Sequence, residues 1–180
     1  MPVTRLLVPN DSAVLAELLR GNRAFLAPWQ PRRGEEYFSD EGQREAVRKA
    51  LEQYDAGSSM PLVILDKEER VVGTVTIQSI IRGFFQSCSV GYWLAESAQG
   101  RGLATTALRE ATRIAFHELR LHRVQAETLP HNVRSQRVLD RLGFVNYGIA
   151  PAYLKLGGSW QDNMLYQLLT PVPDLVAVPD

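Results

Sequence analysis

The sequence predicts a mixed α/β (α+β) fold in which helices flank one central sheet, and three observations lead to this prediction. The strand-like and helix-like segments follow the order β-α-α-β-β-β-α-β-α-β-β, which lacks the regular alternation of a doubly wound sheet. The segments 61–66 and 71–81 are apolar runs joined by the polar turn Lys67-Glu68-Glu69-Arg70, as in a hairpin. The run Ser87–Leu94 is rich in β-formers and leads through a glycine-rich turn into an amphipathic helix.

The N-terminal part of the chain is predicted to contribute one strand and two helices. A short strand over Val3–Val8 ends at Pro9, and Asn10-Asp11-Ser12 offers N-caps for a helix that runs through Leu19 and stops near Gly21. A longer helix is expected over Ser39–Ala56. Its apolar face consists of Val47, Ala50, Leu51 and Tyr54. Between these helices, the proline-flanked aromatic stretch 22–31 is too broken for a long helix. It is either a packing lid over the sheet or one wall of a binding cleft.

The C-terminal half is predicted to alternate between helices and strands before it closes with a strand pair. A helix begins at Leu103, and its buried stripe is Leu103, Ala107, Leu108, Ala111, Ile114 and Ala115. A strand follows over His122–Thr128, then a helix with Asn132 as a plausible N-cap and Gly143 at its C′ position. The closing strands are Val145–Leu154 and Ser159–Leu169. No repeat or linker divides residues 1–170, which are expected to form a single domain, and residues 171–180 form a Pro-rich C-terminal tail.

The glycine-rich turn before the 103–115 helix predicts an anion site suited to phosphate. Gly100 and Gly102 lack a Cβ, so backbone N–H groups can face one concavity and a ligand can come close. The helix start adds its partial positive charge and its unpaired donors. A dinucleotide fingerprint is disfavoured by Thr105 at its third small-residue position, and a P-loop by the lack of a nearby lysine. The pattern that fits is Gln/Arg-x-x-Gly-x-Gly/Ala.

Two motifs, about thirty residues apart, together carry a resemblance to a known family. Gln99, Gly102 and Ala104 satisfy the first pattern, and the second is Asn132-x-x-Ser135-x-x-x-Leu139-x-x-x-Gly143-Phe144. In this order they resemble the acyl-CoA pyrophosphate loop and the following segment of the GNAT N-acetyltransferase superfamily. The resemblance implies a mostly antiparallel sheet with splayed central strands and acetyl-CoA as cosubstrate. It places the acetyl-CoA contacts at Trp93, Leu94, Gln99, Gly100, Arg101, Gly102, Leu103, Ala104, Thr105, Asn132 and Ser135.

Further segments are similar to the ribosomal-protein-alanine N-acetyltransferase branch of that superfamily. They are Asn22-Arg23…Pro28-Trp29, Leu121-His122-Arg123-Val124…Pro130-His131-Asn132 and Tyr153-Leu154…Gly158-Ser159-Trp160-Gln161-Asp162. The branch transfers acetyl to the N-terminal α-amine of a protein, so a protein or peptide N-terminus is the expected acceptor, with Trp29, Tyr92 and Asp162 as substrate contacts. A homodimer is a further expectation from the resemblance alone. Two positions depart from related patterns: Thr106 stands where glutamate is common, and Leu139 where a related branch has a tyrosine acid.

The chemistry of acetyl transfer suggests which side chains act. An α-amine has a pKa of ~7.7–8.0 against ~10.4 for lysine, so a weak or water-relayed base suffices for an N-terminus. Glu127 is the first candidate base, with a solvated glutamate on an outward strand position as the alternative; Glu96 is a weaker candidate. Ser135 is a candidate to hydrogen-bond CoA or to protonate its sulfur, or else only a first-turn helix residue. A backbone N–H from residues 92–95 is expected to polarise the thioester carbonyl.

Composition narrows the remaining function classes. Twenty basic and twenty acidic residues leave a net charge of zero, which gives no sign of nucleic-acid binding. The single cysteine, Cys88, excludes an internal disulfide, fits a reducing cytoplasm and is expected in the core. Apolar runs fall far short of the ~20 residues of a membrane span. The three histidines lack metal-ligand spacing, so no metal is expected. Two alternatives stay open: a small-amine acetyltransferase acting on an antibiotic or polyamine, and a non-catalytic acyl-CoA-binding module.

Overall fold

A seven-stranded, mostly antiparallel sheet organises the molecule, as seen in the computed structural model, which describes residues 2–170. The spatial order of the strands is β1-β2-β3-β4-β5-β7-β6. The strands are β1 (Thr4–Leu6), β2 (Met60–Leu65), β3 (Val71–Ile81), β4 (Ser87–Leu94), β5 (Arg123–Thr128), β6 (Val145–Leu156) and β7 (Ser159–Leu169). The predicted strands and their order along the chain are confirmed, with shifts of a few residues at their ends. The predicted tail, 171–180, lies outside the described residues.

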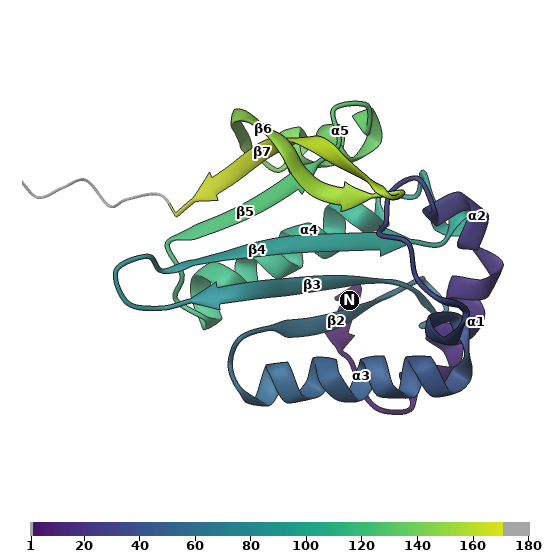
Figure 1. Cartoon of the computed structure of the whole chain (residues 1–180). Helices are drawn as coiled ribbons and strands as arrows, with labels where there is room; N and C mark the ends of the chain where they lie inside the picture. Colours follow the sequence, from purple (N-terminus) through teal and green to yellow (C-terminus); the bar gives the residue numbers. More distant parts are fainter. Residues whose placement is uncertain (1, 171–180) are drawn as a thin grey trace, which may run out of the picture.

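Helices cover both faces of this sheet (Figure 1). They are α1 (Asp11–Gly21), α2 (Arg23–Leu26), α3 (Asp40–Asp55), α4 (Leu103–Arg113) and α5 (Val133–Arg141), with 3₁₀ turns at Glu35–Phe38 and Glu96–Ala98 and a π turn at Ile114–Glu118. The α4 helix therefore changes to a π turn before the end of its predicted stripe. The aromatic stretch 22–31 forms only the four-residue α2, as expected from its prolines.

Two apolar clusters hold the layers together, and strand alternation assigns them to opposite faces. On β2, Val63 points to a cluster with Leu15 of α1 and Val47 of α3. Its neighbours Leu62 and Ile64 point to the larger cluster on the other face, which α4 and α5 cover. The larger cluster also holds Cys88, which is 2% exposed, so its predicted place in the core is confirmed. Among residues 2–170, no helix is both long and apolar enough to cross a membrane.

The start of α1 differs from the prediction. Asn10 occupies the N-cap position, one of the three residues offered for it, but makes no side-chain cap hydrogen bond. Instead, the carboxylate of Asp11 accepts the Val8 N–H at 2.9 Å and both guanidinium branches of Arg5 at 2.7 Å. Burial by itself raises the pKa of Asp11, but these hydrogen bonds and the Arg5 charge together lower it. An ion pair to β1, rather than a local cap, therefore positions this helix.

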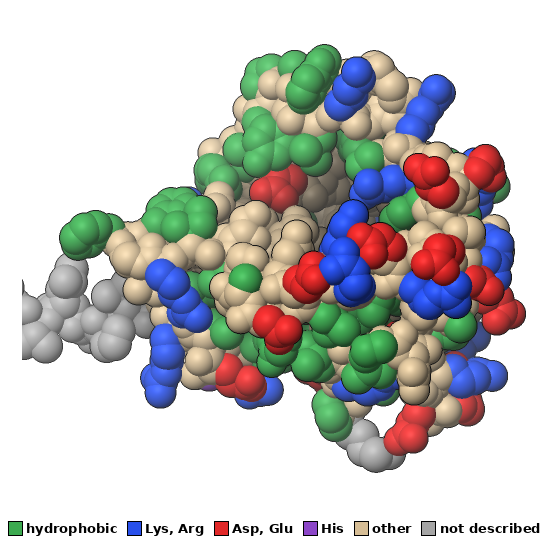
Figure 2. All heavy atoms as spheres, turned by 60° about the horizontal axis from the view of Figure 1, so that its bottom comes forward, with side chains coloured by type: hydrophobic (Ala, Val, Ile, Leu, Met, Phe, Trp, Pro, Cys, Tyr) green, Lys and Arg blue, Asp and Glu red, His purple; other side chains and the backbone are tan. Residues whose placement is uncertain are grey.

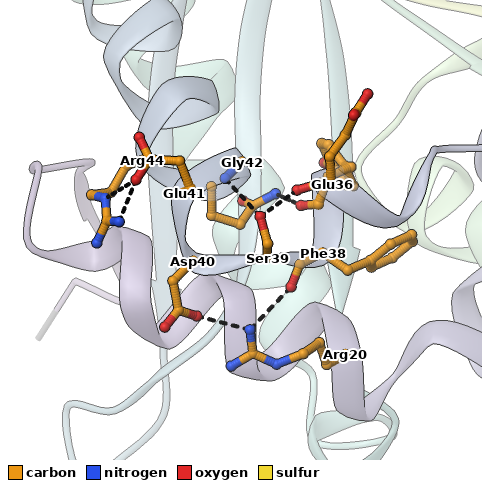
Figure 3. Close-up of polar contacts among 10 residues, drawn as sticks. Arg20, Glu36, Phe38, Ser39, Asp40, Glu41, Gly42 and Arg44 are labelled. Carbon is orange, nitrogen blue, oxygen red and sulfur yellow. Dashed lines mark hydrogen bonds and ion pairs between the residues drawn. The ribbon is translucent and has the colours of Figure 1, made fainter.

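The start of α3 is held by a compact set of hydrogen bonds (Figure 3). The Ser39 hydroxyl donates to the Glu36 carbonyl oxygen at 2.6 Å and accepts the Gly42 N–H at 3.0 Å. Arg20 of α1 donates to the Phe38 carbonyl at 3.0 Å and to Asp40 at 2.8 Å, which ties α1 to α3. A Cβ on Gly42 would stand 1.8 Å from the Glu36 carbonyl oxygen, so this close packing requires glycine.

Replacing this glycine should therefore weaken the fold. We expect Gly42→Ala to lower the free energy of unfolding by ~1–3 kcal/mol, the usual cost of overpacking. Gly21→Ala in α1 is the matched control, because nothing lies within 4 Å of its added Cβ. That control should be neutral or gain ~0.4–1 kcal/mol from the stiffer unfolded chain. Urea unfolding of both variants measures the difference, and equal effects would contradict the packing argument.

Candidate active site

The site begins where the two central strands separate. Parallel β4 and β5 pair only from Ser87 to Ser89 on β4 and from Arg123 to Gln125 on β5. Both strands continue past these pairs, β4 to Leu94 and β5 to Thr128, without pairing to each other. The splayed central strands predicted for this fold are thereby confirmed.

A cavity of about 500 Å³ passes through the sheet at this opening. Successive side chains of a strand point to opposite faces. On β5, both Ala126 and Glu127 line the cavity, and on β4 both Tyr92 and Trp93 do so. The cavity therefore reaches both faces of the sheet, and Figure 2 shows the molecular surface hollowed beneath the apolar top of the molecule, with an acidic side chain beside the hollow. A passage of this kind lets two ligands enter from opposite faces and meet inside.

The edge of β4 that lines this opening offers backbone groups to a ligand. The Ala95 N–H donates to the Val72 carbonyl of β3 at 2.8 Å. Because N–H groups alternate in direction along a strand, the Leu94 N–H points the other way, toward the opening. The Leu94 carbonyl is on that side too, where it accepts a hydrogen bond from Gln99 Nε2 at 3.3 Å. Within the expected range 92–95, Leu94 thus presents an N–H that can polarise a carbonyl group.

The predicted phosphate loop lies between the end of β4 and the start of α4. Gly100 has a φ of 74° and Gly102, the N-cap of α4, a φ of 76°, which only glycine adopts readily. Nothing lies within 4 Å of a Cβ built on either residue, so the space above the loop is open to a ligand. The Gly102 carbonyl accepts the Thr106 N–H at 3.0 Å and its hydroxyl at 3.3 Å. Thr106, which replaces the common glutamate, therefore closes the first turn of α4.

The other predicted loop residues surround these two glycines in different environments. Arg101 is exposed, whereas Leu103, Ala104 and Thr105 are partly buried. Leu103 and Ala104 pack against the larger apolar cluster and so anchor the first turn of α4. A helix start with unpaired N–H donors and open space above it fits a pyrophosphate group.

The N-terminus of α5 forms the opposite wall of the opening. Asn132 caps this helix by accepting the Ser135 N–H at 3.2 Å, and Gly143 ends it with a φ of 81°, as predicted for both residues. The hydroxyl groups of Ser135 and Tyr92 lie 3.1 Å apart and bridge the gap between α5 and β4. Burial raises the pKa of Tyr92, partly offset by this hydrogen bond, so its hydroxyl keeps its proton at neutral pH. Leu139 is buried at the cavity wall and cannot supply a proton.

Glu127 is half-buried in the cavity on the face opposite α4 and α5. Burial raises the pKa of its carboxyl group, and a hydrogen bond to its own backbone offsets only part of this effect. Among residues 2–170, no cationic side chain contributes to that shift. A carboxylate with a raised pKa at the edge of a cavity suits proton transfer better than a fully solvated one. Glu96, the weaker candidate, is exposed and lies outside the cavity wall.

The face of the cavity that contains Glu127 is closed by the segment after α2. Trp29 lines the cavity, and its ring lies 5.5 Å from that of His131, which directly precedes Asn132. Leu26, the last residue of α2, is 5% exposed. The stretch 22–31 thus both packs on the fold and forms a cavity wall, so the two predicted roles coexist.

The structure does not bring every predicted site residue into the cavity. Asp162 is exposed and accepts the Ala152 N–H at 2.8 Å, where β6 is irregular and Ala152 has a φ of 47°. It therefore supports the β6–β7 hairpin and does not line the cavity. Its neighbour Asn163 does line it, as does Tyr37 from the 3₁₀ turn before α3. Sequence reasoning missed both, although a polar residue at an inward position of a strand was a usable signal for Asn163.

Cys88 and the possible metal-ligating side chains lie in the following environments. Burial raises the pKa of the Cys88 thiol to about 12, so Cys88 is a poor nucleophile. In the part of the chain from residue 2 to residue 170, no three His, Cys, Asp or Glu side chains gather as metal ligands would. The groups that face the cavity instead suit positioning, hydrogen bonding and proton transfer.

Comparison with known proteins agrees with this geometry. Residues 3–145 match the family described as "Acetyltransferase (GNAT) domain". The chain is 35% identical over 170 residues to a [Ribosomal protein uS5]-alanine N-acetyltransferase of Escherichia coli strain K12, covering 94% of this chain and 88% of that protein.

Two solved structures extend the comparison to the fold. The ribosomal-protein-S5-alanine acetyltransferase from Vibrio fischeri superposes with a TM-score of 0.87 at 34% identity, covering 92% of this chain and 91% of that one. Mycobacterium smegmatis RimJ in complex with CoA-disulfide gives a TM-score of 0.89 at 28% identity, covering 93% of this chain and 81% of that one. Sequence, fold and cavity agree, and the chain belongs to the GNAT acetyltransferase family.

Proposed function

We propose that this chain is an acetyl-CoA-dependent N-acetyltransferase that acts on the N-terminal α-amine of a protein, with a ribosomal protein as the expected acceptor. The observation that carries the proposal is the cavity through the sheet, with an open helix start near one end and the half-buried Glu127 at the other. The relatives named as ribosomal-protein-alanine acetyltransferases support the acceptor class. A ribosomal acceptor would be met in the cytoplasm, and the cytoplasmic location and the homodimer stay predictions.

The cosubstrate would bind on the α4/α5 side. Acetyl-CoA supplies the acetyl group as a thioester. The N–H groups at the start of α4 bind its pyrophosphate, with Gly100 and Gly102 leaving room for it. The Leu94 N–H, on the unpaired edge of β4, donates to the carbonyl oxygen of the acetyl group and stabilises the negative charge that develops there.

The proton balance of the transfer assigns two further groups. The amine nitrogen forms a bond to the acetyl carbon as the carbon–sulfur bond breaks. Glu127 accepts the amine proton, directly or through one water molecule. The hydroxyl pair Tyr92–Ser135, 3.1 Å apart, donates a proton to the leaving thiolate. Because a thiol pKa is ~8.5, this leaving group needs only a weak acid such as a hydroxyl group.

A panel of acceptors tests the acceptor class. We expect the purified chain to acetylate peptides with a free N-terminal α-amine, including the N-termini of ribosomal proteins. N-terminally blocked peptides that contain lysine and small polyamines should react at least tenfold more slowly, since an amine of pKa ~10.4 is far less deprotonated at neutral pH. Thiol release is the readout. If only small amines are acetylated, the proposed α-amine acceptor is wrong. If acetyl-CoA binds but no thiol is released with any acceptor, the chain is a non-catalytic acyl-CoA-binding module.

Gly102 should be essential for cosubstrate binding. We expect Gly102→Val to weaken CoA binding at least tenfold, about 1.4 kcal/mol. A β-branched residue disfavours the φ of 76° that aims the N–H groups of α4. Gly57→Val is the control, because Gly57 has a φ of 70° with open space around it but lies between α3 and β2. Calorimetry measures the CoA affinity of both variants. An unchanged affinity in Gly102→Val would show that the loop only connects β4 to α4 and does not bind the pyrophosphate.

Glu127 should control the pH dependence of the reaction. For the unmodified chain, kcat/KM should fall as pH drops through the pKa of Glu127, which burial holds above the usual carboxyl value. Glu127→Gln should replace this acid limb with one at the pKa of the amine and lower kcat by ~10²–10⁴ at neutral pH. The deficit should shrink above the pKa of the amine, where the acceptor arrives deprotonated.

The exposed Glu96 provides the matched control for this experiment. Glu96→Gln should leave the pH profile unchanged, because Glu96 does not line the cavity. If kcat falls by less than about threefold in Glu127→Gln and the deficit does not depend on pH, bulk water takes the amine proton. Catalysis would then come from the positioning of the two substrates.

A further inference from the structure

The side chain of Asn163 is a buried polar group of the cavity that the mechanism above does not use. Asn163 is 2% exposed and lines the cavity from β7. Its Oδ1 atom has no hydrogen-bond partner among residues 2–170. Leaving a buried acceptor unsatisfied costs ~1–3 kcal/mol, and buried polar side chains are nearly always paired. A turn of the carboxamide about its Cβ–Cγ bond presents this oxygen to the cavity, where it can accept a hydrogen bond from a ligand.

Strand register places this oxygen on the same side of the sheet as Glu127. Leu165 of β7 lies directly opposite Glu127, and Met164 lies opposite Thr128. Side chains alternate along β7, so Asn163 shares the face of Leu165 and Glu127, whereas Met164 faces α4 and α5. Asn163 and Glu127 are then diagonal neighbours, a relation that separates residues by ~7–8 Å. A gap of that size accommodates one amine nitrogen between the two side chains.

We propose that Asn163 binds the acceptor amine, with its Oδ1 accepting one amine N–H while Glu127 takes the proton. This inference rests on the proposed amine acetylation. An α-ammonium group has three N–H bonds, and loss of one proton to Glu127 leaves two N–H bonds and the lone pair that attacks. A second proton leaves the nitrogen for solvent as the amide forms, and the third N–H, held by Asn163, stays on the amide nitrogen. With one N–H fixed by Asn163, rotation about the Cα–N bond is restricted and the lone pair is held toward the acetyl carbon.

Substitution by leucine separates this role from a structural one. Asn163→Leu keeps a similar volume and removes the unsatisfied buried acceptor, so the melting temperature should stay equal or rise. At the same time, kcat/KM for the acceptor should fall at least tenfold, while the Kd for CoA stays within twofold. Asn146→Leu is the matched control, since Asn146 is exposed on β6 and lies outside the cavity wall; its kinetics should not change.

A second variant tests the position beside Glu127. Asn163→Asp keeps an oxygen acceptor but adds a second carboxylate next to Glu127, which should raise the pKa of Glu127 and move the acid limb of kcat/KM to higher pH. Above that limb, activity should recover to within about threefold of the unmodified chain. A purely space-filling Asn163 would leave kcat/KM within twofold in Asn163→Leu, and this result would overturn the proposal.

The outcomes also separate this inference from the proposed acceptor. If no α-amine peptide is acetylated, the proposed function fails, and the same variants are compared with the amine that the chain does acetylate. The hydrogen bond is to an amine N–H, so the tenfold loss is expected for that amine too. Loss of acetylation together with a lower melting temperature in Asn163→Leu would instead show a folding role and would also overturn the proposal.

Discussion

The divergence of β4 and β5 is the constraint on which the rest of the site depends. A continuous sheet would pair the edge of β4 with β5, and every backbone group there would be consumed. Because pairing stops after Ser89 and Gln125, Leu94 keeps its N–H and carbonyl directed into the opening. An unpaired strand edge is normally a liability that proteins cover. In this fold the edge is enclosed by α5, the segment after α2 and the C-terminal hairpin, so only a ligand within the cavity can reach it.

The same divergence explains why functional groups come from such distant parts of the chain. The opening has two sides, and alternation along each strand sends neighbouring residues to different ends of the cavity. Tyr92 joins Ser135 on the α5 side, whereas Glu127 and Asn163 face the opposite side. The acid that protonates the thiolate and the base that deprotonates the amine are thus separated by the thickness of the sheet. The separation keeps the base from taking the proton that the acid donates to the thiolate.

Much of this could be predicted from the sequence, because local patterns encode it. Apolar periodicity predicted the strands and helices, and the phosphate loop was recognisable since Gly100 and Gly102 must adopt positive φ at a helix start. The family followed from the loop and the segment after Asn132 and is confirmed. Long-range partners carry no such local signal. The Arg5–Asp11 ion pair displaced the expected cap of α1, and Asp162 turned out to support a bulged hairpin.

Asn163 illustrates the limit of sequence reasoning and its physical cause. Nothing in its immediate neighbours indicates that β7 pairs with β5, and only that pairing brings it beside Glu127. Once the register is known, its buried and unsatisfied oxygen becomes informative, because a stable fold would ordinarily exclude or pair such a group. Glu127 likewise opposes stability to function. Burial raises its pKa, and so disfavours the charged form that the reaction requires. Both groups reduce the stability of the empty cavity, and an amine that pairs with both would relieve that cost on binding. Binding energy would then come from the destabilised groups of the protein as much as from contacts with the rest of the acceptor.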